Sequence, residues 1–119
     1  MGKAIGRLQV LTDLDAPVAP LDLVDDALAG GAPVIQVRAK ALDDRAFLVL
    51  AEAVVARCRA AGATCLIDDR LDIALASGAD GVHLGDLALP VAVARRLLGP
   101  DAIIGATAAA AAIFGSWAA

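Results

Sequence analysis

The sequence predicts an α/β fold of about five βα units with parallel strands. Short apolar runs alternate with longer helical stretches at a spacing of roughly 20–30 residues, which is typical of βαβ units. The runs are continuously apolar, as in strands that are covered on both faces. Apolar residues make up 60% of the 119 residues, so the chain can bury one modest core.

Each predicted strand is a short apolar run that ends near a polar residue. The first run ends at Thr12 and Asp13, and the third ends at Asp68 and Asp69. No linker or composition shift divides the chain before residue 107. The five predicted strands are residues 8–11, 34–38, 64–67, 81–84 and 102–105.

Four predicted helices lie between these strands, and a glycine follows each of them. Leu21, Val24 and Leu28 share one face of the first helix. Asp43 suits the positive N-terminal end of the second helix, and Pro90 suits the first turn of the last. The predicted helices are residues 21–28, 43–60, 71–76 and 90–98.

The composition excludes several classes of partner. A net charge of -4 and an aromatic content of 3% argue against nucleic-acid binding. Cys58 and Cys65 are expected to be reduced core thiols, and no signal peptide is recognised, so a cytoplasmic protein is expected. Residues 102–119 carry no charge, but they are mostly small residues that enter lipid weakly, so no membrane partner is expected.

Polar residues follow the predicted strands, where ligands of parallel α/β folds bind. Gln36, Arg38 and Lys40 are spaced two residues apart, so strand alternation places them on one face. Two cations and an amide that converge on one point form an anion site suited to phosphate. The alternative is an edge strand whose charges are simply exposed to water.

Asp68 and Asp69 directly follow an apolar strand, and carboxylates in this position suit Mg²⁺ together with substrate phosphates. The alternative is that one of them caps the short helix that follows. His83, the only histidine, lies inside a predicted strand and is interpreted as structural.

Two architectures satisfy the βα pattern: an open doubly wound sheet, and part of a (β/α) barrel, which normally needs about 250 residues. In a flavodoxin-like receiver, Asp13, Asp15 and Asp69 would supply the acidic residues. A receiver also needs a lysine after its fifth strand, and no lysine follows Lys40. The order of the strands distinguishes the two architectures.

Several segments together resemble the thiamine-phosphate synthase family, whose superfamily also includes a thiazole tautomerase. The Gln-x-Arg-x-Lys strand at 36–40 and the Asp-Asp-Arg motif at 68–70 carry much of this resemblance. The matching segments are residues 6–13, 31–40, 66–74, 78–85 and 89–105. The resemblance implies a TIM-barrel-type (β/α) fold of which residues 1–107 form the N-terminal part only, followed by a divergent Ala-rich tail at 108–119.

The family resemblance implies a Mg²⁺-dependent transferase of thiamine biosynthesis. It would join hydroxymethylpyrimidine diphosphate to thiazole phosphate, giving thiamine phosphate and pyrophosphate. Gln36, Arg38 and Lys40 would hold the diphosphate. Asp68 stands where many members have Asn beside the pyrimidine substrate, and Thr107 stands where many have Ser near the pyrophosphate. No protein nucleophile is required, so no catalytic side chain is assigned.

The same resemblance implies two metal ligands. Asp69 would bind Mg²⁺, and the second ligand of the family falls at Ala88 in this chain. Asp86, two residues earlier, is the candidate replacement.

Beyond Thr107 the family pattern would continue with further βα units. We therefore expect the isolated chain to be impaired as a synthase, with barrel edges exposed for self-association. A flavodoxin-like receiver, a non-catalytic phosphate-binding module and a thiazole tautomerase relative are the alternative functions.

Overall fold

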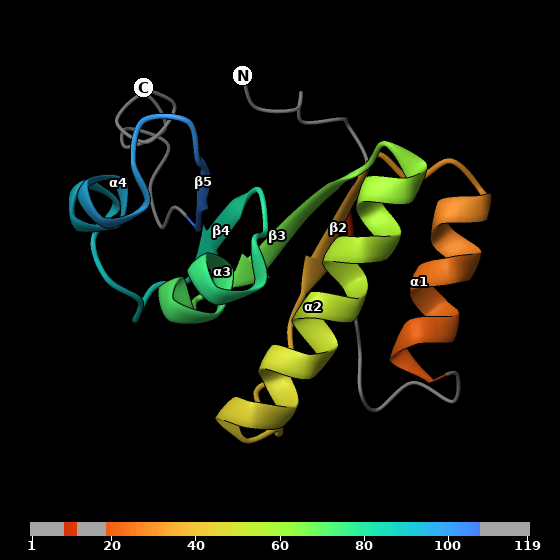
Figure 1. Cartoon of the computed structure of the whole chain (residues 1–119). Coiled ribbons are helices and arrows are strands. Elements are labelled where there is room, and N and C mark those ends of the chain that lie inside the picture. Colours follow the sequence, from red (N-terminus) through yellow and green to blue (C-terminus); the bar gives the residue numbers. More distant parts are fainter. Residues whose placement is uncertain (1–8, 12–18, 108–119) are drawn as a thin grey trace.

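The computed structural model describes residues 9–11 and 19–107, which form a parallel sheet with helices packed against it (Figure 1). The sheet has five strands in the order β1-β2-β3-β4-β5. The strands are β1 (Gln9–Leu11), β2 (Val34–Val37), β3 (Thr64–Asp68), β4 (Gly81–Leu84) and β5 (Ile103–Ala106). The helices are α1 (Pro20–Ala29), α2 (Asp44–Ala61), α3 (Leu71–Ser77) and α4 (Val91–Leu98).

The strand order decides between the two architectures. Every strand pairs in parallel with the strand that follows it along the chain. Consecutive order is the arrangement of neighbouring βα units in a (β/α) barrel, whereas a flavodoxin-like sheet places its second strand at the edge. The partial-barrel prediction is confirmed in this respect, and the flavodoxin-like receiver is wrong. The predicted tail, 108–119, lies outside the described residues.

The element boundaries differ from the predicted ones by at most one residue. β3 extends to Asp68, because Asp68 pairs with His83 of β4. β2 ends at Val37, so Arg38 and Lys40 lie in the loop that follows. Asp43 is the N-cap of α2 rather than its first residue, and its side chain accepts a hydrogen bond from the Ala46 N–H at 2.8 Å.

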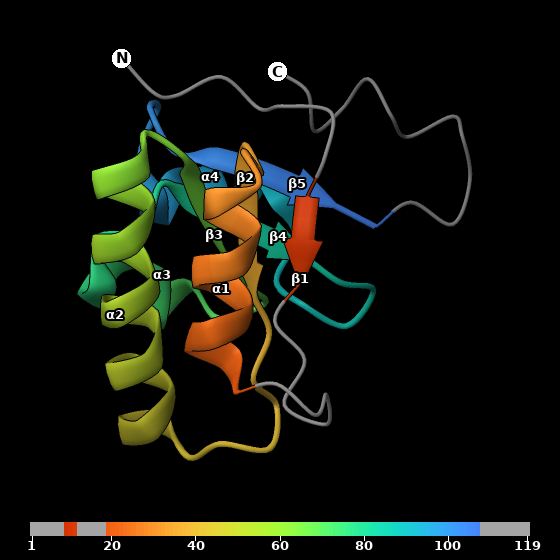
Figure 2. The same cartoon turned by 90° about the vertical axis from the view of Figure 1, so that its right-hand side faces the viewer.

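The sheet has two chemically different faces. Neighbouring parallel strands in register project their side chains to the same side. One face carries Ile35, Ile67 and Val82, which are fully buried with the apolar side of α2. The alternate positions, which project to the opposite face, include Gln36 and Asp68. The helices succeed one another across the apolar face, as the two views show (Figures 1 and 2).

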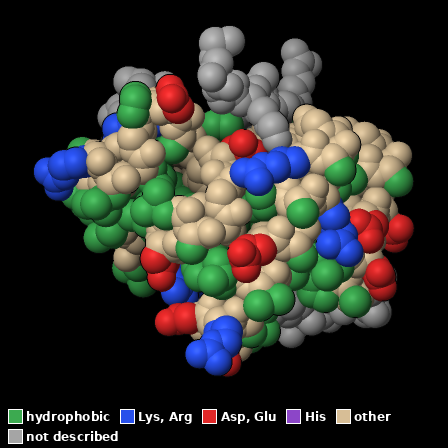
Figure 3. Space-filling model, viewed as in Figure 1, with side chains coloured by type: hydrophobic (Ala, Val, Ile, Leu, Met, Phe, Trp, Pro, Cys, Tyr) green, Lys and Arg blue, Asp and Glu red, His purple; other side chains and the backbone are tan. Residues whose placement is uncertain are grey.

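The distribution of charged side chains on the surface and the burial of the two cysteines agree with what the composition predicts. On the face shown in Figure 3, side chains of both charges are interspersed and form no single basic patch. Cys58 and Cys65 are both buried in the core, which confirms their predicted place there, while their reduced state stays a prediction. Within the described part of the chain, no helix is long and apolar enough to cross a membrane.

Gly81 is required by the close approach of β4 to β5. A Cβ at this position would overlap the backbone carbonyl of Ile103, which cannot move away without disturbing the pairing of the two strands. We expect Gly81→Ala to lower the free energy of unfolding by about 1–3 kcal/mol, measured by urea denaturation. Gly30→Ala is the control, because Gly30 has a helical φ of -80° and an added Cβ would meet its nearest atom at 3.5 Å. Equal stability of the two variants would contradict this account.

Candidate functional site

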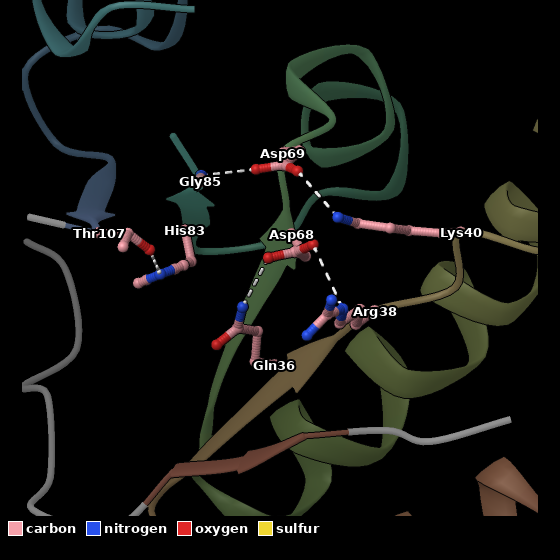
Figure 4. A network of polar contacts seen from close by, with 8 residues as sticks. All are labelled: Gln36, Arg38, Lys40, Asp68, Asp69, His83, Gly85 and Thr107. Carbon is pink, nitrogen blue, oxygen red and sulfur yellow. Dashed lines mark hydrogen bonds and ion pairs between the residues drawn. The ribbon is translucent and has the colours of Figure 1, made fainter. Parts of the chain in front are cut away.

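Polar side chains from β2, β3 and the following loops gather at the carboxyl end of the sheet (Figure 4). Gln36 and Asp68 project to the same face from neighbouring strands. Gln36 Nε2 donates a hydrogen bond to Asp68 Oδ1 at 2.9 Å, and both residues are buried. This contact is the innermost of the site.

Arg38 and Lys40 each reach one of two adjacent carboxylates. Arg38 Nε lies 4.0 Å from Asp68 Oδ2, and Lys40 Nζ lies 3.8 Å from Asp69 Oδ2. The two cationic side chains remain 53% and 63% exposed, so both present surface to an approaching anion. The edge-strand alternative is wrong, because β2 lies between β1 and β3.

The two aspartates do not cap the helix that follows them. The N-cap of α3 is Arg70, and no side chain makes a capping hydrogen bond there. The carboxylate of Asp68 accepts instead from Gln36, and that of Asp69 accepts from the Gly85 N–H at 2.6 Å. Both carboxylates are therefore committed to the site at the end of the sheet.

Asp68 is a buried carboxyl group beside a second carboxylate. Burial raises its pKa above the ordinary value of 3.8, and repulsion from Asp69 adds to this effect. Arg38, Lys40 and the hydrogen bond from Gln36 act in the opposite direction, because they stabilise the charged form. The two cations thus compensate part of the cost of an ionised Asp68.

Gly85 makes room for the Asp69 carboxylate. A Cβ on Gly85 would lie 3.1 Å from Asp69 Oδ1, which the Gly85 N–H already contacts. The backbone of residue 69 is also tied to β4, because its N–H donates to the His83 carbonyl at 2.8 Å. The loops after β3 and β4 are therefore joined through Asp69.

Thr107 lies directly after β5 and belongs to a second contact of the site. Its N–H donates to the Leu84 carbonyl at 2.8 Å, and its Oγ1 lies 3.2 Å from His83 Nε2. Gly105 faces the imidazole across the strand pair, where a Cβ would meet His83 Nδ1 at 3.0 Å. His83 therefore orients a hydroxyl group at the carboxyl end of the sheet (Figure 4).

Asp86 is the one predicted site residue that stands apart. It is exposed in a turn that the Ala88 N–H closes on the Gly85 carbonyl at 3.2 Å. Among the residues that the structure describes, no hydrogen bond or ion pair joins Asp86 to the rest of the site, and no three potential metal-ligating side chains cluster together. Ala88 packs against the apolar core.

A hollow of about 210 Å³ adjoins the site between the loops that follow β2 and β3. Its lining combines charged and apolar side chains: Ala39, Lys40, Leu42, Phe47, Asp68, Asp69 and Arg70. Lys40 and Asp69 are thus accessible from this side, and the buried Asp68 forms part of its lining.

Three contributors to the site were not predicted. They are the backbone N–H of Gly85, the imidazole of His83 and the guanidinium of Arg70, which forms part of the hollow. The spacing of residues along one strand carries no information about these groups, because each acts across neighbouring elements. Of the three groups, only Arg70 has a signal in the sequence that could have placed it in the site: it directly follows the two aspartates.

The chain is similar to known proteins over most of its length. A family described as thiamine monophosphate synthase matches residues 9–114. Curated thiamine-phosphate synthases of Chlorobium luteolum and Moorella thermoacetica are 56% and 50% identical to the chain, over 100 and 99 residues. These alignments cover 84% and 83% of this chain, and 46% and 47% of the two relatives.

A solved structure, thiamine phosphate pyrophosphorylase from Pyrococcus furiosus, is 37% identical to the chain, with a TM-score of 0.75. The similarity covers 84% of this chain and 48% of that protein. The chain therefore spans about half the length of the relatives that it matches.

Replacing Asp68 by Asn tests the electrostatics of the site. Because the pKa of Asp68 is raised in the folded state, its ionised form opposes folding at neutral pH. Asn keeps an acceptor for Gln36 without the charge. We expect Asp68→Asn to raise the free energy of unfolding at pH 7, and Arg38 is 53% exposed, so its loss of a partner leaves no buried unpaired charge.

The raised pKa of Asp68 also predicts how the stability difference between the two proteins changes with pH. As the pH falls through the folded pKa of Asp68 towards 3.8, the wild-type carboxyl becomes protonated and the advantage of Asn disappears. Urea denaturation of both proteins at about pH 7 and about pH 4 measures the difference. An advantage of the same size at both values, or a loss of stability at pH 7, would refute this interpretation.

Proposed function

Because the chain belongs to the thiamine monophosphate synthase family, we propose that it supplies the diphosphate-binding part of an enzyme of thiamine biosynthesis. The proposed reaction joins hydroxymethylpyrimidine diphosphate to thiazole phosphate and releases thiamine phosphate and pyrophosphate. The observation that carries this proposal is the convergence of Arg38 and Lys40 on two adjacent carboxylates at the carboxyl end of the sheet.

The cations and the amide act on the leaving group. Negative charge grows on the pyrophosphate as its bond to the pyrimidine breaks, and preorganised cations stabilise that charge. Arg38 presents a planar fork to phosphate oxygens, while Lys40 adds a mobile point charge. The buried bond from Gln36 to Asp68 supports the loop that carries them, because it ties β2 to the end of β3.

Asp69 and Asp86 are the proposed Mg²⁺ ligands. The donor set fits this ion, since Mg²⁺ in phosphate-handling enzymes takes one or two carboxylates and completes its shell with water and substrate phosphates. The Asp69 carboxylate is already oriented by Gly85 and remains partly exposed. Bound Mg²⁺ would neutralise part of the charge on the pyrophosphate. Asp86 reaches the site only if a ligand draws its exposed turn inward.

The remaining site residues have supporting roles in this proposal. Thr107, oriented by His83, would donate its hydroxyl hydrogen to a phosphate oxygen. Asp68 would contact the pyrimidine from the inner side of the site. The proposed synthase must hold a diphosphate, and the paired cations suit that group, so they favour the synthase over the thiazole tautomerase alternative. Cytoplasmic location and self-association through exposed strand edges stay predictions.

Pyrophosphate binding tests the proposal without requiring turnover. We expect the 119-residue chain to bind pyrophosphate in the presence of Mg²⁺ in a calorimetric titration. Arg38→Ala and Lys40→Ala should each weaken binding by about 10- to 100-fold, because each removes a charge-assisted contact. Arg96→Ala is the control, since Arg96 is exposed on α4 and distant in the fold from the loop after β2.

Two outcomes would count against the proposal. One is the absence of heat at millimolar pyrophosphate, and the other is an equal loss of affinity in the Arg96→Ala control. Assays with both organic substrates then separate a working synthase from a diphosphate-binding module that lacks turnover. We expect no turnover from this chain alone.

A further inference from the structure

The two aspartates of the site belong to a strained turn. Asp69 has a φ of +63°, and it is the only described residue other than glycine with a positive φ. Across it, the Arg70 N–H donates a hydrogen bond to the Asp68 carbonyl at 2.8 Å. A hydrogen bond between residues i and i+2 around a central positive φ marks the rarer, strained form of the γ-turn. Such a conformation persists only where its surroundings hold it.

The strain has a direct consequence for the site. The turn separates the directions of the two neighbouring carboxylates, so that Asp68 faces Gln36 while Asp69 faces Gly85 and Lys40. If residue 69 relaxed to the usual negative φ, its carboxylate would leave the Gly85 N–H. The geometry of the proposed metal ligand therefore depends on whatever holds the turn.

On the side away from the sheet, Arg70 holds the end of this turn. Its Nε and Nη2 donate to the two carboxylate oxygens of Asp72 at 3.0 and 2.9 Å. Nη2 also lies 3.0 Å from Asp44 Oδ1, at the start of α2. The guanidinium stacks over the Phe47 ring, 5.7 Å from its centre, and Phe47 is buried in the core.

These contacts tie the turn to two helices. A bidentate pair with a carboxylate fixes a guanidinium more firmly than a single contact does. Phe47 and Asp44 belong to α2, whereas Asp72 lies in the first turn of α3. The carboxylates of Asp72 and Asp44 are 67% and 83% exposed, so the ion pairs alone contribute little, and the constraint on Arg70 comes from the bidentate geometry and the contact with buried Phe47.

We propose that Arg70 is a positioning residue: by anchoring the strained turn to α2 and α3, it keeps the Asp69 carboxylate aimed at the ligand site. Its effect on ligand affinity rests on the proposed function. Its effect on the geometry of Asp69 does not. The competing explanation is that Arg70 only adds stability at the junction of the two helices.

The Gly85 amide reports directly on the geometry of Asp69, because its N–H donates to that carboxylate. The test therefore compares Arg70→Gln and Arg70→Lys with the parent chain, by amide hydrogen exchange and by pyrophosphate titration in the presence of Mg²⁺. In Arg70→Gln we expect exchange at Gly85 to accelerate about 10-fold and pyrophosphate affinity to fall about 10-fold. Arg70→Lys should restore part of both, since lysine keeps the charge but not the fork.

The matched control is Arg57→Gln. Arg57 also joins two helices, with Nε donating to Asp25 Oδ1 at 2.8 Å, but it lies on the outer side of α2 and α1. We expect it to lower the thermal midpoint without changing exchange at Gly85 or pyrophosphate affinity. If Arg70→Gln also lowers the midpoint but leaves the Gly85 amide unchanged, the positioning role is refuted.

Two further experimental results would also bear on these proposals. If the parent chain binds no pyrophosphate, the proposed function fails, and exchange at Gly85 still decides the role of Arg70. If Arg70→Gln does not fold, Asp44→Asn takes its place in the test. Asp44 is 83% exposed, and its substitution weakens only one of the contacts of Arg70. This variant should accelerate exchange at Gly85 in the same direction by a smaller factor, and no acceleration would overturn the proposal.

Discussion

The buried carboxylate of Asp68 is the constraint on which the rest of the site depends. A carboxylate removed from water must be hydrogen-bonded or paired, because an uncompensated buried charge is costly. The chain meets this requirement with Gln36 from the neighbouring strand and with Arg38 from the loop after it. The same contacts hold β2 against β3 at the end where a ligand would bind. The side chains that compensate the buried charge are therefore among those proposed to bind the ligand.

A second carboxylate directly beside the first makes that arrangement harder to satisfy. Asp68 and Asp69 repel each other, and their repulsion contributes to the raised pKa of Asp68. The left-handed backbone at Asp69 turns its carboxylate so that one oxygen accepts from the Gly85 N–H after β4, while the other lies near Lys40 in the loop after β2. The strained turn thus points the carboxylates of Asp68 and Asp69 in different directions, which separates their like charges. A polyvalent anion and a divalent cation would both find complementary groups within this small region.

The sheet supports the site through its two unlike faces. One face is apolar and packs on the helices, while alternate positions at the opposite face include Gln36, Asp68 and His83. Glycines occur where neighbouring groups come closest, at Gly81 against the β5 backbone and at Gly105 against the imidazole. Small residues at these positions allow the strands to approach, and they leave space for the polar side chains that the site needs.

Much of this could be predicted from the sequence, because it follows from local patterns. The alternation of apolar runs and helical stretches predicted the α/β class and every described element to within one residue at each end. The grouping of Gln36, Arg38 and Lys40 with Asp68 and Asp69 was predictable, since the carboxyl ends of parallel strands meet at one edge. The motif at 36–40 and the Asp-Asp-Arg motif also indicated the family.

Only the tertiary structure decided how these groups divide their contacts. It showed that neither aspartate caps α3, that Asp69 adopts a positive φ, and that Asp86 stands apart. It also joined His83 to Thr107. These features depend on strand register and on distances between residues far apart in the chain. Local periodicity determines which residues face one side of a strand, whereas the packing of neighbouring strands and helices determines which of them touch.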